Sequence, residues 1–229
     1  MITHDPVMLT LAGLGGIVPS LLWLWFWMRQ EGDKPEPKGL LTVIFILGMA
    51  ATILVLPVQK FIQTHVDSSS WKLIDWAAAE ELVKFIAVVL VLYKSNQIDE
   101  ATDWPIYLIT AALGFAALEN ALFLLKPIHL GQATVGLLTG QLRFLGSTLL
   151  HAVTSGIVGI SMGLSLSMSP FLKKFYLLAG LLAAIALHST FNFFIMKNTG
   201  GGFLQVFAFL WVTAIIVMLL FEKLRRVDQ

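Results

Sequence analysis

Seven apolar stretches, each about long enough to cross a membrane as a helix, constrain the fold of this chain more than any other feature. Crossing ~30 Å of hydrocarbon takes ~20 predominantly apolar residues. Of the 229 residues, 57% are hydrophobic and 13% are charged, whereas soluble domains average roughly 25% charged residues. We therefore predict one integral-membrane domain, residues 1–229, with an all-α fold: a polytopic helical bundle of about seven transmembrane helices. The predicted spans are Val7–Met28, Gly39–Leu56, Leu73–Tyr93, Trp104–Leu125, Phe144–Leu164, Phe175–Met196 and Phe203–Phe221.

The lysine and arginine residues between the spans predict their orientation. Nine lie in the loops after the first, third and fifth spans and in the C-terminal tail, and five lie on the opposite side. Since cytoplasmic loops carry an excess of Lys and Arg, we expect a multi-pass plasma-membrane protein with its N-terminus outside and its C-terminus in the cytoplasm. Residues 29–38 then form a cytoplasmic loop and residues 222–229 a cytoplasmic tail. Residues 126–143, the longest piece between spans, are a candidate gating loop.

The third stretch carries three charged residues where a membrane helix is expected to hold only hydrocarbon: Glu80, Glu81 and Lys84. A charge at the centre of a membrane helix costs ~2.5–3.5 kcal/mol on insertion scales. Lys84 is four residues from Glu80 and three from Glu81, so it can pair with either carboxylate. One lysine does not account for two acids, and the small alanines at 77–79 allow a neighbouring helix to approach closely. We therefore expect this helix to face protein.

Further polar residues lie inside three other stretches: Glu119 with Asn120, His151, and His188 with Asn192. Under the predicted topology, Glu80 and these residues lie about six to eight positions from the outer ends of their spans, which is roughly 10 Å below the outer surface. A lone His or Asn in a membrane helix is often only an interhelical hydrogen bond, but scattered structural groups need not share a depth. We therefore predict an active site among the third to sixth spans. Its predicted catalytic residues are Glu80, Glu81, Glu119, His151, His188 and Asn192, with Lys84 and Asn120 in support.

Two chemistries fit these residues. In the first, a carboxylate activates a water that a neutral imidazole orients, and His188 with Asn192 donates hydrogen bonds to an oxyanion. In the second, Glu119, His151 and His188 bind a divalent ion, since carboxylate and imidazole suit zinc, and the ion activates the water. The sequence leaves both open, so the cofactor is unknown, with Zn²⁺ as the candidate. The absence of cysteine excludes a thiolate nucleophile and cysteine metal ligands.

Common protease motifs give little support to other mechanisms. The chain has no His-Glu-x-x-His and no Gly-x-Gly-Asp motif, but Gly159-Ile-Ser-Met-Gly163 matches the Gly-x-Ser-x-Gly pattern of serine nucleophiles. Ser161 lies ten residues beyond His151, ~15 Å further along the same helix, so it is far from either histidine. We interpret Gly159 and Gly163 as a packing face between helices.

The order of these motifs resembles that of the PrsW family of intramembrane proteases, which is distantly related to the type II CAAX prenyl endopeptidases and the bacterial CPBP proteins. The similar segments are Glu80-Glu81-x-x-Lys84, Phe115-x-x-x-Glu119-Asn120, His151 and His188-x-x-x-Asn192. Lys34-Pro-Glu-Pro37 also looks like the family's Glu-Pro-Glu-Pro loop, with Lys34 in place of the first acid. The resemblance covers about Trp23 to Asn192.

The resemblance implies an endopeptidase that cuts a membrane-anchored protein near its extracytoplasmic face, typically an anti-sigma factor in bacterial signalling. It implies that Glu80 or Glu81 activates water and that His188 and Asn192 stabilise the oxyanion. The prenyl endopeptidases carry His where this chain has Glu119, so His151 is a candidate for supplying that imidazole. The family's enzymes have been called both metalloproteases and glutamic-type proteases, which matches the two chemistries above.

Two other functions use the same residues. A proton- or cation-coupled transporter would use the buried carboxylates as a relay, although the sequence has no convincing inverted repeat. A non-catalytic membrane protein that binds a partner would need Lys84 only to neutralise the acids.

For the protease, the expected partners are the lipid bilayer and a membrane-anchored protein substrate. The net charge of +1 gives no indication of nucleic-acid binding.

Overall fold

The computed structural model describes residues 6–30, 34–93, 97–130, 142–197 and 203–226, and all regular structure in these ranges is helical. Each of the seven predicted spans corresponds to one helix, so the prediction of an all-α bundle is confirmed. A short π-helix, η1, leads directly into α6. The helices are α1 (Pro6–Met28), α2 (Lys38–His65), α3 (Ser69–Leu92), α4 (Asp103–His129), η1 (Arg143–Ser147), α6 (Thr148–Leu164), α7 (Pro170–Lys197) and α8 (Phe203–Arg225).

Six of these helices are long and apolar enough to cross a membrane by length and composition. The exception among the described helices is α3, which is 24 residues long but contains Glu80, Glu81 and Lys84 in addition to charged residues near its start. The structure compensates for these charges by turning them toward other helices, because Glu80, Glu81 and Lys84 are buried, whereas Leu82, Ile86 and Leu90 of the same helix are exposed.

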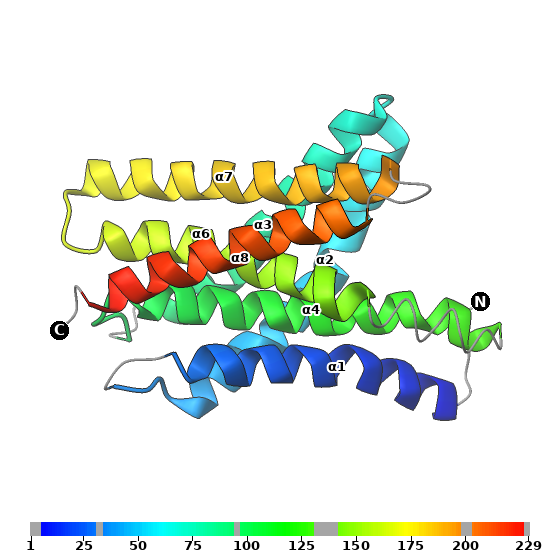
Figure 1. Cartoon of the computed structure of the whole chain (residues 1–229), viewed down its shortest axis with the longest axis horizontal. Helices are drawn as coiled ribbons and strands as arrows, with labels where there is room; N and C mark the ends of the chain where they lie inside the picture. Colours follow the sequence, from blue (N-terminus) through cyan, green and yellow to red (C-terminus); the bar gives the residue numbers. More distant parts are fainter. Residues whose placement is uncertain (1–5, 31–33, 94–96, 131–141, 198–202, 227–229) are drawn as a thin grey trace.

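α4 and α6 form the centre of the bundle. Their apolar stretches are 67% and 72% buried, against 39% or less for α1, α2, α7 and α8. α4 lies between α1 and α6, while α7 packs on the far side of α6 and α8 crosses in front (Figure 1). The hairpin of α2 and α3 crosses behind them obliquely, and its tip projects beyond the rest of the bundle (Figure 1).

Small residues allow the neighbouring helices to pack closely on α4. A Cβ atom added to Gly48 of α2 would collide with the carbonyl oxygen of Ala111, and one added to Gly114 of α4 would collide with that of Phe45. A Cβ atom at Gly16 of α1 would likewise collide with the carbonyl oxygen of Ala117. This is the close backbone approach that small residues give to membrane helices.

The glycines of the Gly-x-Ser-x-Gly motif also have a packing role, as predicted. A Cβ atom at Gly159 would collide with the backbone of Pro105, and one at Gly163 with the carbonyl oxygen of Ala101. Ser161 lies against Gly180 of α7. The motif therefore joins α6 to the start of α4 and to α7.

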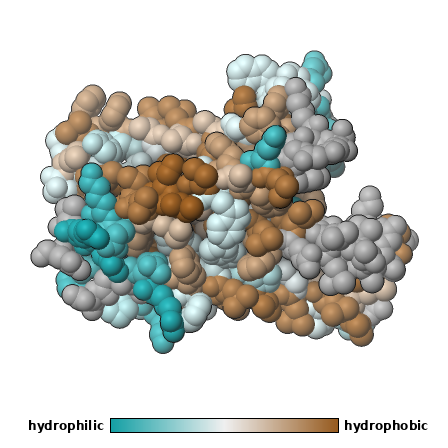
Figure 2. Space-filling view, viewed as in Figure 1, coloured by the Kyte–Doolittle hydropathy of each residue, from teal (hydrophilic) through white to brown (hydrophobic). Residues whose placement is uncertain are grey.

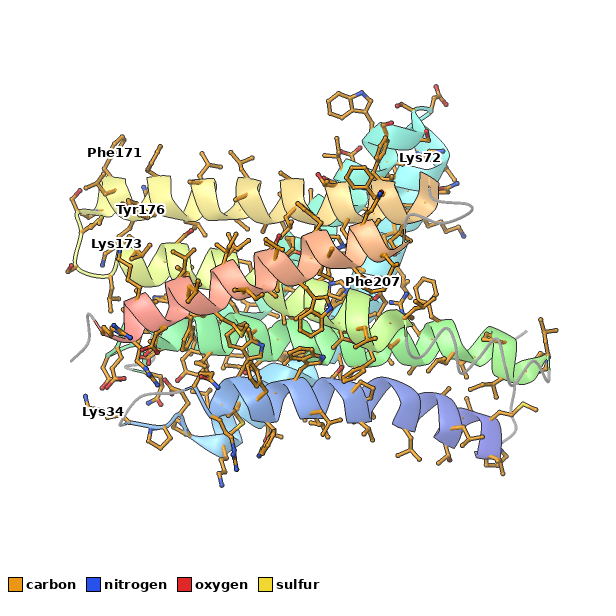
Figure 3. The ribbon with its side chains drawn as sticks, in the orientation of Figure 1. Lys34, Lys72, Phe171, Lys173, Tyr176 and Phe207 are labelled. Carbon is orange, nitrogen blue, oxygen red and sulfur yellow. The ribbon has the colours of Figure 1, made fainter. Side chains whose placement is uncertain are left out.

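The surface agrees with a membrane location. Hydrophilic side chains gather near the C-terminus and at the tip of the α2–α3 hairpin, and apolar side chains cover much of the face between them (Figure 2). Lys34 and Lys173 lie at the end of the bundle opposite to Lys72 (Figure 3). The protein is therefore a multi-pass membrane protein, with its helix ends grouped at two polar faces.

The loop before α2 is anchored to the start of α4. Tyr107 donates a hydrogen bond to the buried carboxylate of Glu36. Lys34 forms ion pairs with Asp99 at 3.3 Å and with Glu100 at 3.6 Å, and its hydrogen bond to Asp99 raises the pKa of Lys34. The segment that resembles the family's Glu-Pro-Glu-Pro loop thus fixes the α1–α2 connection at the end of the bundle far from the α2–α3 turn (Figure 1).

Several helices are longer than the predicted spans because hydropathy marks the hydrocarbon region, whereas hydrogen-bonded helix continues into the interface. α2 runs nine residues past Leu56 to His65, and α4 continues to His129, into the candidate gating loop. Residues 131–141 of that loop lie outside the described residues. α8 continues to Arg225, into the predicted tail 222–229, whose last three residues also lie outside them.

Candidate active site

Four helices bring the predicted polar residues together inside the bundle. Glu80, Glu119, His151 and His188 each lie about two to three turns from the helix end nearest the α2–α3 turn. Glu80, Glu81, Lys84, His151 and His188 are each at most 5% exposed. Charged groups buried to this extent need partners, and their contacts form one continuous network.

Glu81 is the most fully bonded residue of the network. Its Oε1 atom lies 2.7 Å from Lys84 Nζ and 2.7 Å from His188 Nδ1. Thr154 donates to the same oxygen at 3.0 Å, and Ser155 donates to Oε2 at 3.3 Å. Both carboxylate oxygens are therefore occupied, and Glu81 fixes the imidazole of His188 in place.

Lys84 determines how the ring of His151 is protonated. Its Nζ atom lies 3.2 Å from His151 Nδ1. Because an ammonium group only donates, Nδ1 accepts, and the ring proton of a neutral His151 sits on Nε2. That nitrogen lies 3.2 Å from Oε2 of Glu119, so it donates to this carboxylate. The ring of Phe115, 5.3 Å from Lys84 Nζ, shields the ammonium group on another side.

Glu119 is held mainly by Arg143, the first residue of η1. The guanidinium forms an ion pair with Glu119, donates to Asn120 Oδ1 at 2.5 Å and donates to Ser147 at 3.0 Å. It also lies over the ring of Phe123, 3.9 Å from the centroid. Asn120 in turn donates to Thr148 at 2.8 Å. Glu119 therefore has a dedicated cation and does not depend on Lys84.

Glu80 differs from Glu81 in having one free oxygen. Gln59 of α2 donates to Glu80 Oε1 at 2.7 Å. Oε2 is buried and has no hydrogen-bond partner among the described residues, and it lies 3.6 Å from His188 Nε2. Since Nδ1 of His188 donates to Glu81, a neutral ring presents an Nε2 lone pair toward Glu80. Two acceptor atoms thus lie 3.6 Å apart, and a water molecule or a cation beside the pair could contact both.

Part of this network lines a cavity of about 750 Å³. Glu80, Glu119, His151, His188 and Asn192 line it, whereas Glu81 and Lys84 lie behind its wall. The remaining lining is largely apolar and comes from α2, α3, α4, α6, α7, α8 and the segment leading into α6. Its larger apolar members are Leu56, Leu73, Trp76, Phe115, Leu122, Phe123, Leu142, Leu150, Phe191, Ile195, Met196 and Phe207. A mainly apolar cavity with a few convergent polar groups is typical of a binding site.

The geometry also provides one set of candidate metal ligands among the described residues. Glu80, His151 and His188 each offer an atom within 4.8 Å of the others. Two imidazoles and a carboxylate form a ligand set found in catalytic zinc sites, and the unpartnered Oε2 of Glu80 fits such a role. The ligand set considered from the sequence contained Glu119 with the two histidines. In the structure Glu80 takes that place, and Glu119 is instead paired with Arg143.

Several polar residues of the site were not identified from the sequence, among them Arg143 and Gln59. Arg143 was placed in a loop, yet Arg143, Ser147, His151 and Ser155 follow one another at intervals of four, so they lie on one face of a continuous helix. Gln59 lies beyond the apolar run that ends at Leu56 and gives no signal of its own.

A polytopic helical bundle that assembles carboxylates and imidazoles around an internal cavity is the arrangement expected of an intramembrane protease. The sequence of residues 36–221 matches the family described as "PrsW family intramembrane metalloprotease". The chain therefore belongs to the PrsW family, and it is a membrane endopeptidase. This membership favours the protease over the transporter and the non-catalytic partner-binding protein.

Curated relatives cover most of the chain. It is 31% identical over 210 residues to the "Protease PrsW" of Oceanobacillus iheyensis, a match that covers 87% of this chain and 91% of that protein. It is 25% identical over 205 residues to the "Protease PrsW" of Geobacillus kaustophilus, with 87% of each chain covered. The "Protease PrsW" of Bacillus subtilis is 24% identical over 202 residues, covering 86% of this chain and 88% of that protein. No solved structure shows a significant match.

Proposed function

We propose that the chain hydrolyses a peptide bond of a membrane-anchored protein near its extracytoplasmic face, with Glu80 as the base that activates water. The observation that carries this assignment is the contrast between the two adjacent glutamates. Glu81 is saturated and lies behind the cavity wall, whereas Glu80 lines the cavity and keeps Oε2 free beside His188 Nε2.

In the proposed reaction, a water molecule sits beside the pair formed by Glu80 Oε2 and His188 Nε2 and donates one hydrogen bond to each. The water oxygen attacks the carbonyl carbon of the scissile bond while its proton passes to Glu80 Oε2. Glu80 then returns this proton to the leaving amine as the C–N bond breaks, so proton and charge balance over the cycle. Glu81 keeps His188 in the tautomer that accepts from water.

This assignment gives His188 a different role from the one the resemblance implies. With Nδ1–H bound to Glu81, a neutral His188 has no proton on Nε2 to donate to an oxyanion. Asn192, one turn further along α7, lines the cavity and carries two amide donors. We assign oxyanion stabilisation to Asn192, and to His151 and Glu119 the task of holding the polar wall of the cavity in place.

A zinc ion held by Glu80, His151 and His188 would polarise the scissile carbonyl and acidify a bound water. For His151 to serve as a ligand, it must release either Lys84 at Nδ1 or Glu119 at Nε2. Zinc would take up the Oε2 atom of Glu80 and the Nε2 atom of His188, so the metal route and the proton transfers assigned to Glu80 are alternatives. The orienting role of Glu81 is the same in both.

The resemblance to the family makes an anti-sigma factor the substrate class that we propose. Purified wild-type protein in proteoliposomes should cut a doubly tagged, membrane-anchored anti-sigma factor into two fragments. Glu80→Gln and His188→Ala should abolish the cut while both variants keep the thermal transition of a folded protein. Cutting at the wild-type rate by folded Glu80→Gln would rule out the proposed base.

A further inference from the structure

Gln59 is placed to control the geometry of Glu80 from a helix that carries none of the predicted site residues. It lies on α2, two residues after Pro57, and lines the cavity. Its side-chain amide donates to Glu80 Oε1 at 2.7 Å, and its main-chain carbonyl accepts a hydrogen bond from Trp76 Nε1 at 3.1 Å. Trp76 precedes Glu80 by one turn of α3. Two hydrogen bonds therefore fasten Gln59 to the turn of α3 that carries Glu80.

The Gln59 amide occupies one of the two oxygens of Glu80 and leaves the other free. A carboxylate has two equivalent oxygens, and rotation about its terminal torsion exchanges them at little cost. Among the described residues, Gln59 is the one hydrogen-bond donor to Glu80 that the structure places on Oε1, and Oε2 has none. Without this donor, neither oxygen would be held beside His188 Nε2.

We infer that Gln59 is a positioning residue for Glu80: its amide fixes Oε1 so that Oε2 faces His188 and the reacting water. This inference rests on the proposed role of Glu80 as the base. It adds a residue from α2, outside the segments that resemble the family motifs, and it gives the projecting α2–α3 hairpin a function in aligning the base.

Kinetic measurements separate positioning from substrate binding. Gln59→Leu removes the donor with a side chain of similar size, and Gln59→Asn keeps an amide but shortens its reach by one methylene. Each should lower kcat by ~10- to 100-fold, the usual effect of removing an outer-shell partner, and leave KM within about twofold. Gln63, exposed on the next turn of α2, is the matched control, and Gln63→Leu should leave both constants unchanged.

A readout independent of activity tests the contact itself. The thermal transition is measured for wild type, Gln59→Leu, Glu80→Ala and the double variant. If Gln59 bonds to Glu80, Gln59→Leu should shift the transition in the wild-type background and shift it much less once Glu80 is removed. Equal shifts in the two backgrounds would overturn the contact.

The same set of variants distinguishes this inference from the proposed function. Inactive Glu80→Gln together with fully active Gln59→Leu would overturn the positioning role and leave the proposed base intact. A rise in KM at unchanged kcat in the Gln59 variants would overturn it in favour of a substrate contact. Active, folded Glu80→Gln would instead remove the proposed function on which the inference rests.

Discussion

The imidazole of His188 lies 2.7 Å through Nδ1 from Oε1 of Glu81, and this bond makes the two neighbouring glutamates of α3 unequal. It leaves the other ring nitrogen of His188 facing Glu80, a cavity-lining residue whose unpartnered oxygen lies 3.6 Å away. Because the adjacent residues leave the helix about 100° apart, one carboxylate is enclosed by α6 and α7 and the other reaches the cavity. Removing the carboxylate of Glu80 should therefore have a different physical effect from removing that of Glu81.

Glu80→Gln should lower kcat/KM by ~10²–10⁴-fold, the usual contribution of a positioned general base, and should not lower stability. Glu81→Gln should also inactivate, but through the fold, because it leaves the buried ammonium of Lys84 without its carboxylate. Breaking a buried ion pair costs ~3–5 kcal/mol. Cleavage assays combined with thermal denaturation in detergent check both effects. Equal loss of stability in the two variants would contradict the distinct roles.

The ion pair of Arg143 and Glu119 gives a second prediction. Arg143→Gln should lower activity, because the carboxylate that accepts from His151 Nε2 loses its cation. Adding Glu119→Gln to Arg143→Gln should recover part of the lost stability, since the double variant has no unpaired charge at this position. We expect the unfolding free energies to be non-additive by ~0.5–3 kcal/mol in a double-mutant cycle.

Lys60 provides the control for this cycle. It is an exposed cation of α2, whose C-terminal end lies near the α2–α3 turn, so Lys60→Gln removes a positive charge from the same side of the bundle without breaking the Glu119 contact. It should leave activity and stability unchanged. Additive effects of Arg143→Gln and Glu119→Gln would show that their contact does not stabilise the protein.

The fold was predictable because membrane helices are recognised from the length and hydropathy of their apolar stretches. This held even for α3, despite its charges. The shared depth of Glu80, Glu119, His151 and His188 was also readable, since rise per residue converts position into height. What periodicity does not give is which helices are neighbours. The sequence therefore does not show which cation pairs with Glu119, and in the structure Arg143 does.

The sequence also could not predict that Glu80 and Glu81 have different hydrogen-bond partners. Adjacent residues of the same type have the same local signal, and the partners that distinguish them come from other helices: Gln59 from α2, His188 from α7, and Thr154 from α6. Gln59 was missed for a further reason, because it follows Pro57 beyond the apolar run and resembles an ordinary interfacial residue. Such contacts depend on helix rotation and packing, which hydropathy does not specify.

The candidate ligand set predicts a distinctive pattern of zinc binding. If the metal route operates, protein freed of metal with a chelator and then titrated with Zn²⁺ should bind one equivalent per chain, because the ligand atoms of Glu80, His151 and His188 lie within 4.8 Å of one another. His188→Ala and Glu80→Gln should lose this stoichiometric site. Glu119→Gln should keep it, because Glu119 is outside the set. Metal analysis after gel filtration measures the outcome, and retention by Glu80→Gln with loss by Glu119→Gln would reverse the assignment.

The predicted orientation can be tested with single cysteines, because the natural chain has none. Asp67, in the α2–α3 turn, and Ser167, in the α6–α7 turn, are both exposed and lie at opposite ends of the bundle (Figure 1). With the N-terminus outside, Asp67→Cys should react with a membrane-impermeant maleimide on intact cells. Ser167→Cys should react only after the membrane is permeabilised. The reverse pattern would place the cavity on the cytoplasmic side, and the proposed cut at the extracytoplasmic face of the substrate would then be excluded.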